Sequence, residues 1–231
     1  MTTTVRSIVS EHPQPVTEVV VPDAGSPHRL DGEAVSALAG ELRRARKAAG
    51  VVLVRVEGDA WHQAPPGELP DVDWAVDTVA GRYQAVVRQL FALDLPVVVH
   101  VDGAVSGLGL ALAAAADLRV CSSRSTWAVG HPATALLGGT GWLLERLVGT
   151  GRYAHLAWTG RSLDAAQALA VGLVGDVDDD PQAGRALAEH VAALPAAATS
   201  ALKRATASRH RSDLDVALGY ESWLAGVAAG Q

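Results

Sequence analysis

The stretch LPVVVHVDGAVSGLGLALAAAADLR, residues 95–119, holds the local signals that decide the fold. Its β-branched run, Val97–Val101, predicts a short buried strand. The apolar stretch Leu110–Ala116 predicts a helix, and Asp117–Val120 predicts one more strand. Between the first strand and the helix the chain turns through three glycines, at Gly103, Gly107 and Gly109.

This glycine turn is the first candidate site. A strand that turns through glycines into a helix places the backbone N–H groups of a helix N-terminus at the strand's end. Such a place suits an anion or a polarised carbonyl oxygen, with Gly107 and Gly109 as candidate contacts. The spacing does not match a dinucleotide fingerprint. A purely structural tight turn is the other interpretation.

Working outward from this stretch, strand and helix patterns alternate along the chain, which predicts an α/β fold. Asp31 has the chemistry of an N-cap for the helix that follows it, and Ser162 is the expected cap of a later one. The expected strands are Thr17–Val21 and Val51–Val56, and the expected helices are Gly32–Ala49, Trp74–Leu93, a short one within Gly138–Gly151, Asp164–Ala170, Gln182–Leu194 and Ala198–Arg209.

Composition excludes several classes of protein. The 231 residues carry a net charge of −6, and no block of basic residues indicates nucleic-acid binding. A single cysteine, Cys121, excludes an internal disulfide. The longest apolar run, Leu108–Ala116, is about half a bilayer span, and the N-terminus shows no export signal. We therefore expect a soluble cytoplasmic protein that does not bind membranes.

Among the eight histidines, His131 lies in a Val-Gly-His-Pro loop where its ring could face a pocket. A lone loop histidine is also commonly structural, so both interpretations stay open. No histidine pair has a metal-ligand spacing with a carboxylate, and we expect no metal. Ser106 is not in a Gly-x-Ser-x-Gly motif, and no ordered His/Asp set follows it, which disfavours a serine hydrolase.

Two long segments resemble the crotonase (enoyl-CoA hydratase/isomerase) superfamily. The more specific one is LVGTGRYAHLAWTGRSLDAAQALAVGLVGDV, residues 147–177, and the other is the opening stretch, residues 95–119. They occur in the family's order without gaps, and the resemblance extends from about Thr17 to Ser208. It implies a spiral of β-β-α turns over residues 1–180, with a C-terminal helical region, residues 181–231, that covers the core or a neighbouring subunit. It also implies a homotrimer or a dimer of trimers.

The resemblance implies a substrate and an oxyanion hole. Family members bind acyl-coenzyme A and hold the thioester oxygen between two backbone N–H groups, which stabilises an enolate. The second donor maps to Leu108, where the family usually has a glycine. The first maps to Gly67 in an ungapped alignment, whereas a rival alignment that matches Trp61 to the family's aromatic residue puts Pro65 there. Proline has no N–H group, so we prefer Gly67.

The acid/base residues depart from the family. Its two catalytic glutamates map to Ala111 and His131, so both carboxylates are absent. A histidine can still move a proton at neutral pH, which makes His131 the expected acid/base. Trp127 is a candidate pocket or core wall, and Lys203 a candidate contact for the phosphates of CoA. We expect no cofactor, with coenzyme A entering as part of the substrate.

The resemblance therefore favours a divergent acyl-thioester enzyme that catalyses hydration or dehydration, isomerisation, or decarboxylation. The thioester carrier is CoA or a carrier protein. A role in secondary metabolism, such as dihydroxyphenylacetyl-CoA formation, is a narrower expectation. The alternative is a non-catalytic protein of the same fold that assists a partner synthase.

Overall fold

A computed structural model describes residues 4–8, 14–21, 32–48, 50–61, 79–130, 138–207 and 210–229. The strands are β1 (Thr4–Ile8), β2 (Val16–Val21), β3 (Val51–Glu57), β4 (Val97–Asp102), β5 (Ala104–Ser106), β6 (Leu118–Cys121), β7 (Thr126–Ala128), β8 (Leu163–Asp164) and β9 (Asp176–Val177). The helices are α1 (Gly32–Ala48), α2 (Val79–Phe91), α3 (Leu108–Ala115), α5 (Thr140–Val148), α6 (Thr150–Thr159), α7 (Ala165–Ala170), α8 (Ala183–Ala192), α9 (Ala196–Ala207) and α10 (Arg211–Ala229).

The strands form two sheets. The larger has the order β1-β2-β3-β4-β6-β9, and its neighbours pair in parallel except β1, which is antiparallel to β2. In the smaller sheet β7 lies between β5, which is parallel to it, and β8, which is antiparallel. The predicted α/β fold is confirmed.

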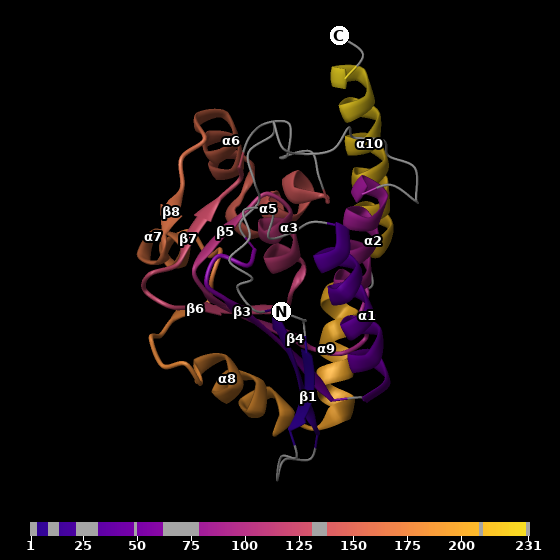
Figure 1. The fold of residues 1–231 in the computed structure, drawn as a ribbon, viewed down its shortest axis with the longest axis vertical. Coiled ribbons are helices and arrows are strands. Elements are labelled where there is room, and N and C mark those ends of the chain that lie inside the picture. Colours follow the sequence, from indigo (N-terminus) through magenta and orange to yellow (C-terminus); the bar gives the residue numbers. More distant parts are fainter. Residues whose placement is uncertain are drawn as a thin grey trace.

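The larger sheet is covered on both faces, as its continuous apolar strands require. Successive residues of β3 point to opposite faces. Val52 and Val54 belong to the main core with residues of α1 and α2, whereas Val51 and Leu53 pack with residues of α8. Figure 1 shows α1 and α2 on one side of this sheet and α8 on the other.

The cap of α7 differs from the prediction. Ser162 is not the N-cap. The side chain of Asp164 accepts a hydrogen bond from the Gln167 backbone N–H at 2.7 Å, and Gln167 Oε1 accepts one from the Asp164 N–H at 3.1 Å. This reciprocal capping box satisfies two backbone donors at once, which a serine two residues earlier cannot do.

Two helices were not predicted from the sequence, α6 and α10. Helix α10 buries Leu214, Leu218 and Glu221 but exposes three large apolar side chains on its other side. Those exposed side chains are Val216, Tyr220 and Trp223. Apolar residues around much of the helix blur the 3.6-residue period on which prediction depends.

The C-terminal helices cover the core as expected, with α8 on the sheet and α10 packed against α2 and α5. The expected boundary at residue 180 falls between β9 and α8. Across the described helices, none is both long enough and apolar enough to cross a lipid bilayer.

Candidate functional site

The glycine turn joins β5 to α3 as predicted, and the helix begins two residues earlier than expected, at Leu108. Gly107 has φ 56° and ψ −123°, a conformation in which a side chain would be strained. Gly107 has no side chain with which to cap the helix, and its carbonyl oxygen accepts the Ala111 N–H at 3.2 Å. Leu108 therefore stands at the N-terminus of α3, where the helix dipole favours negative charge.

The turn is packed against the end of β3. A Cβ atom on Gly109 would lie 2.0 Å from the Trp61 carbonyl oxygen, and one on Gly103 would lie 1.9 Å from the Gly58 carbonyl oxygen. The Ser106 N–H donates to that same Trp61 oxygen at 3.1 Å. These glycines are required because another stretch of backbone occupies the space of a side chain.

The strand β7 brings a second segment to the same edge. It runs parallel to β5 with Ser106 opposite Ala128, so both strands end beside the turn. The chain continues from Ala128 through Val129 and Gly130 toward His131. His131 itself lies outside the described residues, as does Gly67, which follows Trp61 by six positions. Two described residues beside the turn, Ala128 and Trp61, thus precede His131 and Gly67 in the chain by a few positions.

Helix α3 is buried along its whole length, and it carries no carboxylate at the position where the family has one. Ala111 is fully buried and presents a methyl group. A Cβ atom on Gly138 would lie 3.2 Å from Leu108 Cδ1 and 3.4 Å from Ala111 Cβ. The glycines before α5 therefore close the space beside Ala111.

A buried carboxyl group, that of Glu221, lies next to the glycines before α5. Glu221 Oε2, on α10, accepts the Gly139 N–H at 2.7 Å. Burial raises the pKa of Glu221 to about 7, against backbone hydrogen bonds from Gly139 and Gly141 that lower it. Glu221 was not predicted as a site residue, because nothing in the local pattern around position 221 indicates a distant partner.

Trp127 is a core residue. It is 1% exposed, lies opposite Val105 of β5 and Leu163 of β8, and belongs to the main core. The neighbouring strand β6 carries the buried thiol of Cys121, whose pKa burial raises to about 11. A thiol with so high a pKa is a poor nucleophile at neutral pH.

Lys203 is buried and engaged with an acidic residue. Its Nζ donates to Asp117 Oδ2 at 2.6 Å, and the same oxygen accepts the Val97 N–H at 2.8 Å. Binding of a CoA phosphate by Lys203 requires this ion pair to open.

Arg119 fixes the far end of α3. Its guanidinium donates to the carbonyl oxygens of Ala113, Ala116 and Leu173 at 3.3, 2.6 and 2.7 Å. Burial lowers the pKa of Arg119 to about 10, so it stays charged at neutral pH. Helix α3 is thereby tied at its C-terminus to the segment between α7 and β9.

The chain belongs to the enoyl-CoA hydratase/isomerase family, whose sequence profile matches residues 75–223. It is 32% identical over 163 residues to the 1,2-epoxyphenylacetyl-CoA isomerase of Escherichia coli K12, covering 68% of this chain and 61% of that protein. It is 30% identical over 198 residues to a probable enoyl-CoA hydratase of Rhodobacter capsulatus, covering 82% of this chain and 76% of the relative. The chain thus spans less than two thirds of the Escherichia coli isomerase.

Solved structures agree on the fold. An enoyl-CoA hydratase/isomerase from Pseudoalteromonas atlantica superposes with a TM-score of 0.82 at 22% identity, covering 98% of this chain and 92% of that one. An enoyl-CoA hydratase from Bacillus halodurans superposes with a TM-score of 0.80 at 17% identity, covering 94% and 92%. The crotonase-like spiral expected from the sequence is confirmed.

Proposed function

We propose that the protein acts on an acyl thioester and stabilises an enolate at the N-terminus of α3. The observation that carries this proposal is the Gly107 turn, which sets Leu108 at the N-terminus of a helix that is buried along its whole length. The Leu108 N–H is the donor to the thioester oxygen, and Gly67 supplies the second N–H. Backbone donors held in place at a helix N-terminus stabilise developing negative charge without reorganising during the reaction.

His131 is the acid/base in this proposal. The imidazole takes the proton from the carbon next to the thioester, and the electron pair left behind moves onto the thioester oxygen. In dehydration the imidazole returns this proton to the departing hydroxyl, which leaves as water, and in isomerisation it returns the proton to another carbon of the substrate. In hydration it takes a proton from water, whose hydroxyl adds to the β-carbon, and gives that proton to the carbon next to the thioester. Because position 111 is alanine, α3 offers no carboxylate to share this work with His131.

The test is turnover of a panel of enoyl-, β-hydroxyacyl- and arylacetyl-CoA thioesters, with products identified by mass spectrometry. His131→Ala should lower kcat by roughly 10² to 10⁴-fold with little change in KM, because the oxyanion donors remain. His190→Ala is the matched control, since that histidine is exposed on α8, and it should leave kcat unchanged. Unchanged turnover in His131→Ala would refute the histidine mechanism.

The acyl group is proposed to be an aryl-substituted one. The Escherichia coli relative is, by its name, an isomerase of an epoxyphenylacetyl-CoA. A place in secondary metabolism, such as the formation of dihydroxyphenylacetyl-CoA, agrees with this class. Faster turnover of straight-chain than of arylacetyl thioesters would contradict it.

Ala111 also supports a second candidate function. Without a carboxylate on α3, the fold could bind a thioester and assist a partner synthase without catalysing a step itself. Acyl-CoA binding by calorimetry with no product from any thioester, and stimulation of a synthase on mixing, would favour this function.

We propose further that copies of the chain assemble through α10 into a homotrimer or a dimer of trimers. Val216, Tyr220 and Trp223 are 73%, 60% and 61% exposed, and the rings of Tyr220 and Trp223 stack at 5.7 Å. Such an apolar surface is typical of a protein interface. Light scattering that detects a monomer at micromolar concentration would exclude this assembly.

A further inference from the structure

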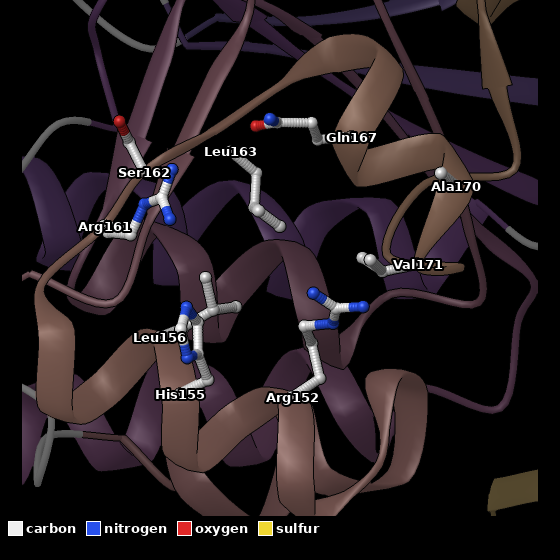
Figure 2. Close-up of a pocket in the computed structure, with 9 residues that line it drawn as sticks. All are labelled: Arg152, His155, Leu156, Arg161, Ser162, Leu163, Gln167, Ala170 and Val171. Carbon is white, nitrogen blue, oxygen red and sulfur yellow. The ribbon is translucent and has the colours of Figure 1, made fainter.

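A pocket of about 280 Å³ lies between α6, the connection after it, β8 and α7, in a part of the molecule that the proposed reaction does not use. Figure 2 shows Arg152 and His155 rising from α6, and Gln167 reaching across from α7. Arg161 and Ser162 come from the connection between the two helices. The remaining lining is apolar and is provided by Leu156, Leu163, Ala170 and Val171.

The rim of this pocket is cationic. Arg152 and His155 are three residues apart on α6, so they share one face of the helix. None of the nine lining residues is acidic. Within the part of the chain that the structure describes, neither Arg152 nor Arg161 forms an ion pair with a carboxylate, whereas Arg55, Arg88 and Arg211 each do.

Gln167 adds an uncharged donor to the rim. Its Oε1 accepts the Asp164 N–H, and the Asp164 carboxylate accepts the Gln167 N–H in return. Because the amide oxygen is engaged in this capping box, the amide nitrogen is the part of the side chain that remains for a ligand. Asp164 is the acidic residue next to the pocket in sequence, and its carboxylate is already bonded to the N-terminus of α7.

The scaffold beneath these side chains is fixed. Helix α6 ends at Gly160, which has φ 66° and whose N–H donates to the Leu156 carbonyl at 3.0 Å. The Thr159 hydroxyl donates to the His155 carbonyl at 2.6 Å and accepts the Arg161 N–H at 3.4 Å. The backbone that carries Arg161 is therefore bonded to the helix that carries His155.

We infer that this pocket binds a small oxyanion, a phosphate ester or a carboxylate, whose body is apolar. Guanidinium groups match the geometry of both anions and bind them by paired, charge-assisted hydrogen bonds. The serine hydroxyl and the glutamine amide satisfy further oxygens. The floor at Leu156 and Leu163 is part of the main core and takes the apolar body.

The experiment is calorimetric titration of the whole protein with inorganic phosphate, phenyl phosphate and benzoate. Phenyl phosphate should bind more tightly than inorganic phosphate because its ring covers the apolar floor. Arg152→Ala/Arg161→Ala should weaken binding by roughly 10-fold or more. The control Arg43→Ala/Arg82→Ala removes the same charge from exposed positions on α1 and α2 and should leave the affinity unchanged.

A second variant tests the site without removing a cation. Ser162→Asp places a carboxylate at the rim and should abolish binding of all three probes by repulsion. Equal affinities in the two double variants, full binding by Ser162→Asp, or no binding by the native chain at millimolar concentration would each overturn the inference.

Coenzyme A identifies the source of the anion. If CoA displaces phenyl phosphate, the occupant is a phosphate of CoA, and if the two bind together, it is a separate small molecule. His131→Ala should bind phenyl phosphate like the native protein. This binding therefore stands or falls separately from the proposed catalytic function.

Discussion

Helices α3 and α5 begin in the same way, and their N-termini are used differently. Each follows a glycine with positive φ, Gly107 or Gly139, and neither has a side-chain cap of its own. At α5 the protein supplies a hydrogen-bond acceptor from elsewhere, because the carboxyl group of Glu221 on α10 accepts the Gly139 N–H. At α3 no acidic side chain stands in the first turn, and Ala111 follows. The N-terminus of α5 thus attaches α10, and we propose that the N-terminus of α3 binds the substrate.

The largest effect is expected where the α3 turn depends on close backbone contact. Gly109→Ala would place a methyl group 2.0 Å from the Trp61 carbonyl oxygen, so the two segments must separate. A shift of about 1 Å at a reacting centre can cost 100-fold, and we expect at least that loss in kcat. Gly151→Ala, on α6, is the control, since its Cβ would meet nothing within 4 Å. Full turnover in Gly109→Ala would show that the turn is not the site.

Leu108→Ala separates the side chain from the backbone donor at α3. The side chain is fully buried in the core, so its truncation should lower the free energy of unfolding by about 3 kcal/mol. The N–H group remains, and kcat of the folded fraction should stay within about tenfold. Denaturant unfolding and steady-state kinetics measure the two effects. A loss of about 100-fold in kcat without unfolding would mean that the side chain acts directly.

The pH dependence of stability should report the carboxylate at α5. The folded pKa of Glu221 is raised from 4.5 to about 7, so its contribution to stability is full below pH 4.5. That contribution falls as the pH rises through 7, by at most about 3 kcal/mol. Glu221→Gln does not titrate and should lack this loss. Parallel stability curves for the two proteins between pH 5 and 8 would contradict the assignment.

A smaller effect on the free energy of unfolding is expected when the hydrogen-bond acceptor at the N-terminus of α5 is removed and the pH is held constant. Glu221→Ala leaves the buried Gly139 N–H without its partner and should lower the free energy of unfolding by about 2 kcal/mol at pH 6. Glu221→Gln keeps an acceptor oxygen and should lose less. Equal losses in the two variants, measured by denaturant unfolding, would mean that packing rather than the hydrogen bond attaches α10.

The sequence predicted the turn and helix at α3, but it did not predict the contact of Glu221 with the N-terminus of α5. The β4–α3–β6 stretch follows local rules, because β-branched runs and glycine punctuation determine the strand, turn and helix there. The Glu221–Gly139 contact joins residues far apart in the chain, and no local pattern reports it. The pocket with Arg152, His155 and Arg161 was not foreseen for a different reason: its residues lie close together in the chain, but helix α6, which carries the first two, was not predicted.

Two local features explain the remaining differences between the predicted and the observed elements: rival N-cap residues and very short strands. Ser162 and Asp164 are both good N-cap residues, and Gln167 decides between them because it completes the capping box with Asp164. Strands β5 and β7 have three residues each, too short for a periodicity to be recognised. They exist because they pair with each other beside the turn. The roles of Gly67 and His131 remain predictions, since both lie outside the described residues.

Arg119 has a consequence for which acyl groups the proposed site at α3 would accept. Its three bonds to carbonyl oxygens anchor α3 at the end away from Leu108, and the helix is buried on all sides. A bulkier substrate cannot be accommodated by sliding this helix without breaking those bonds. If α3 binds the thioester as proposed, substrate preference should evolve, and be engineered, through the other walls of the site, with α3 as a fixed reference.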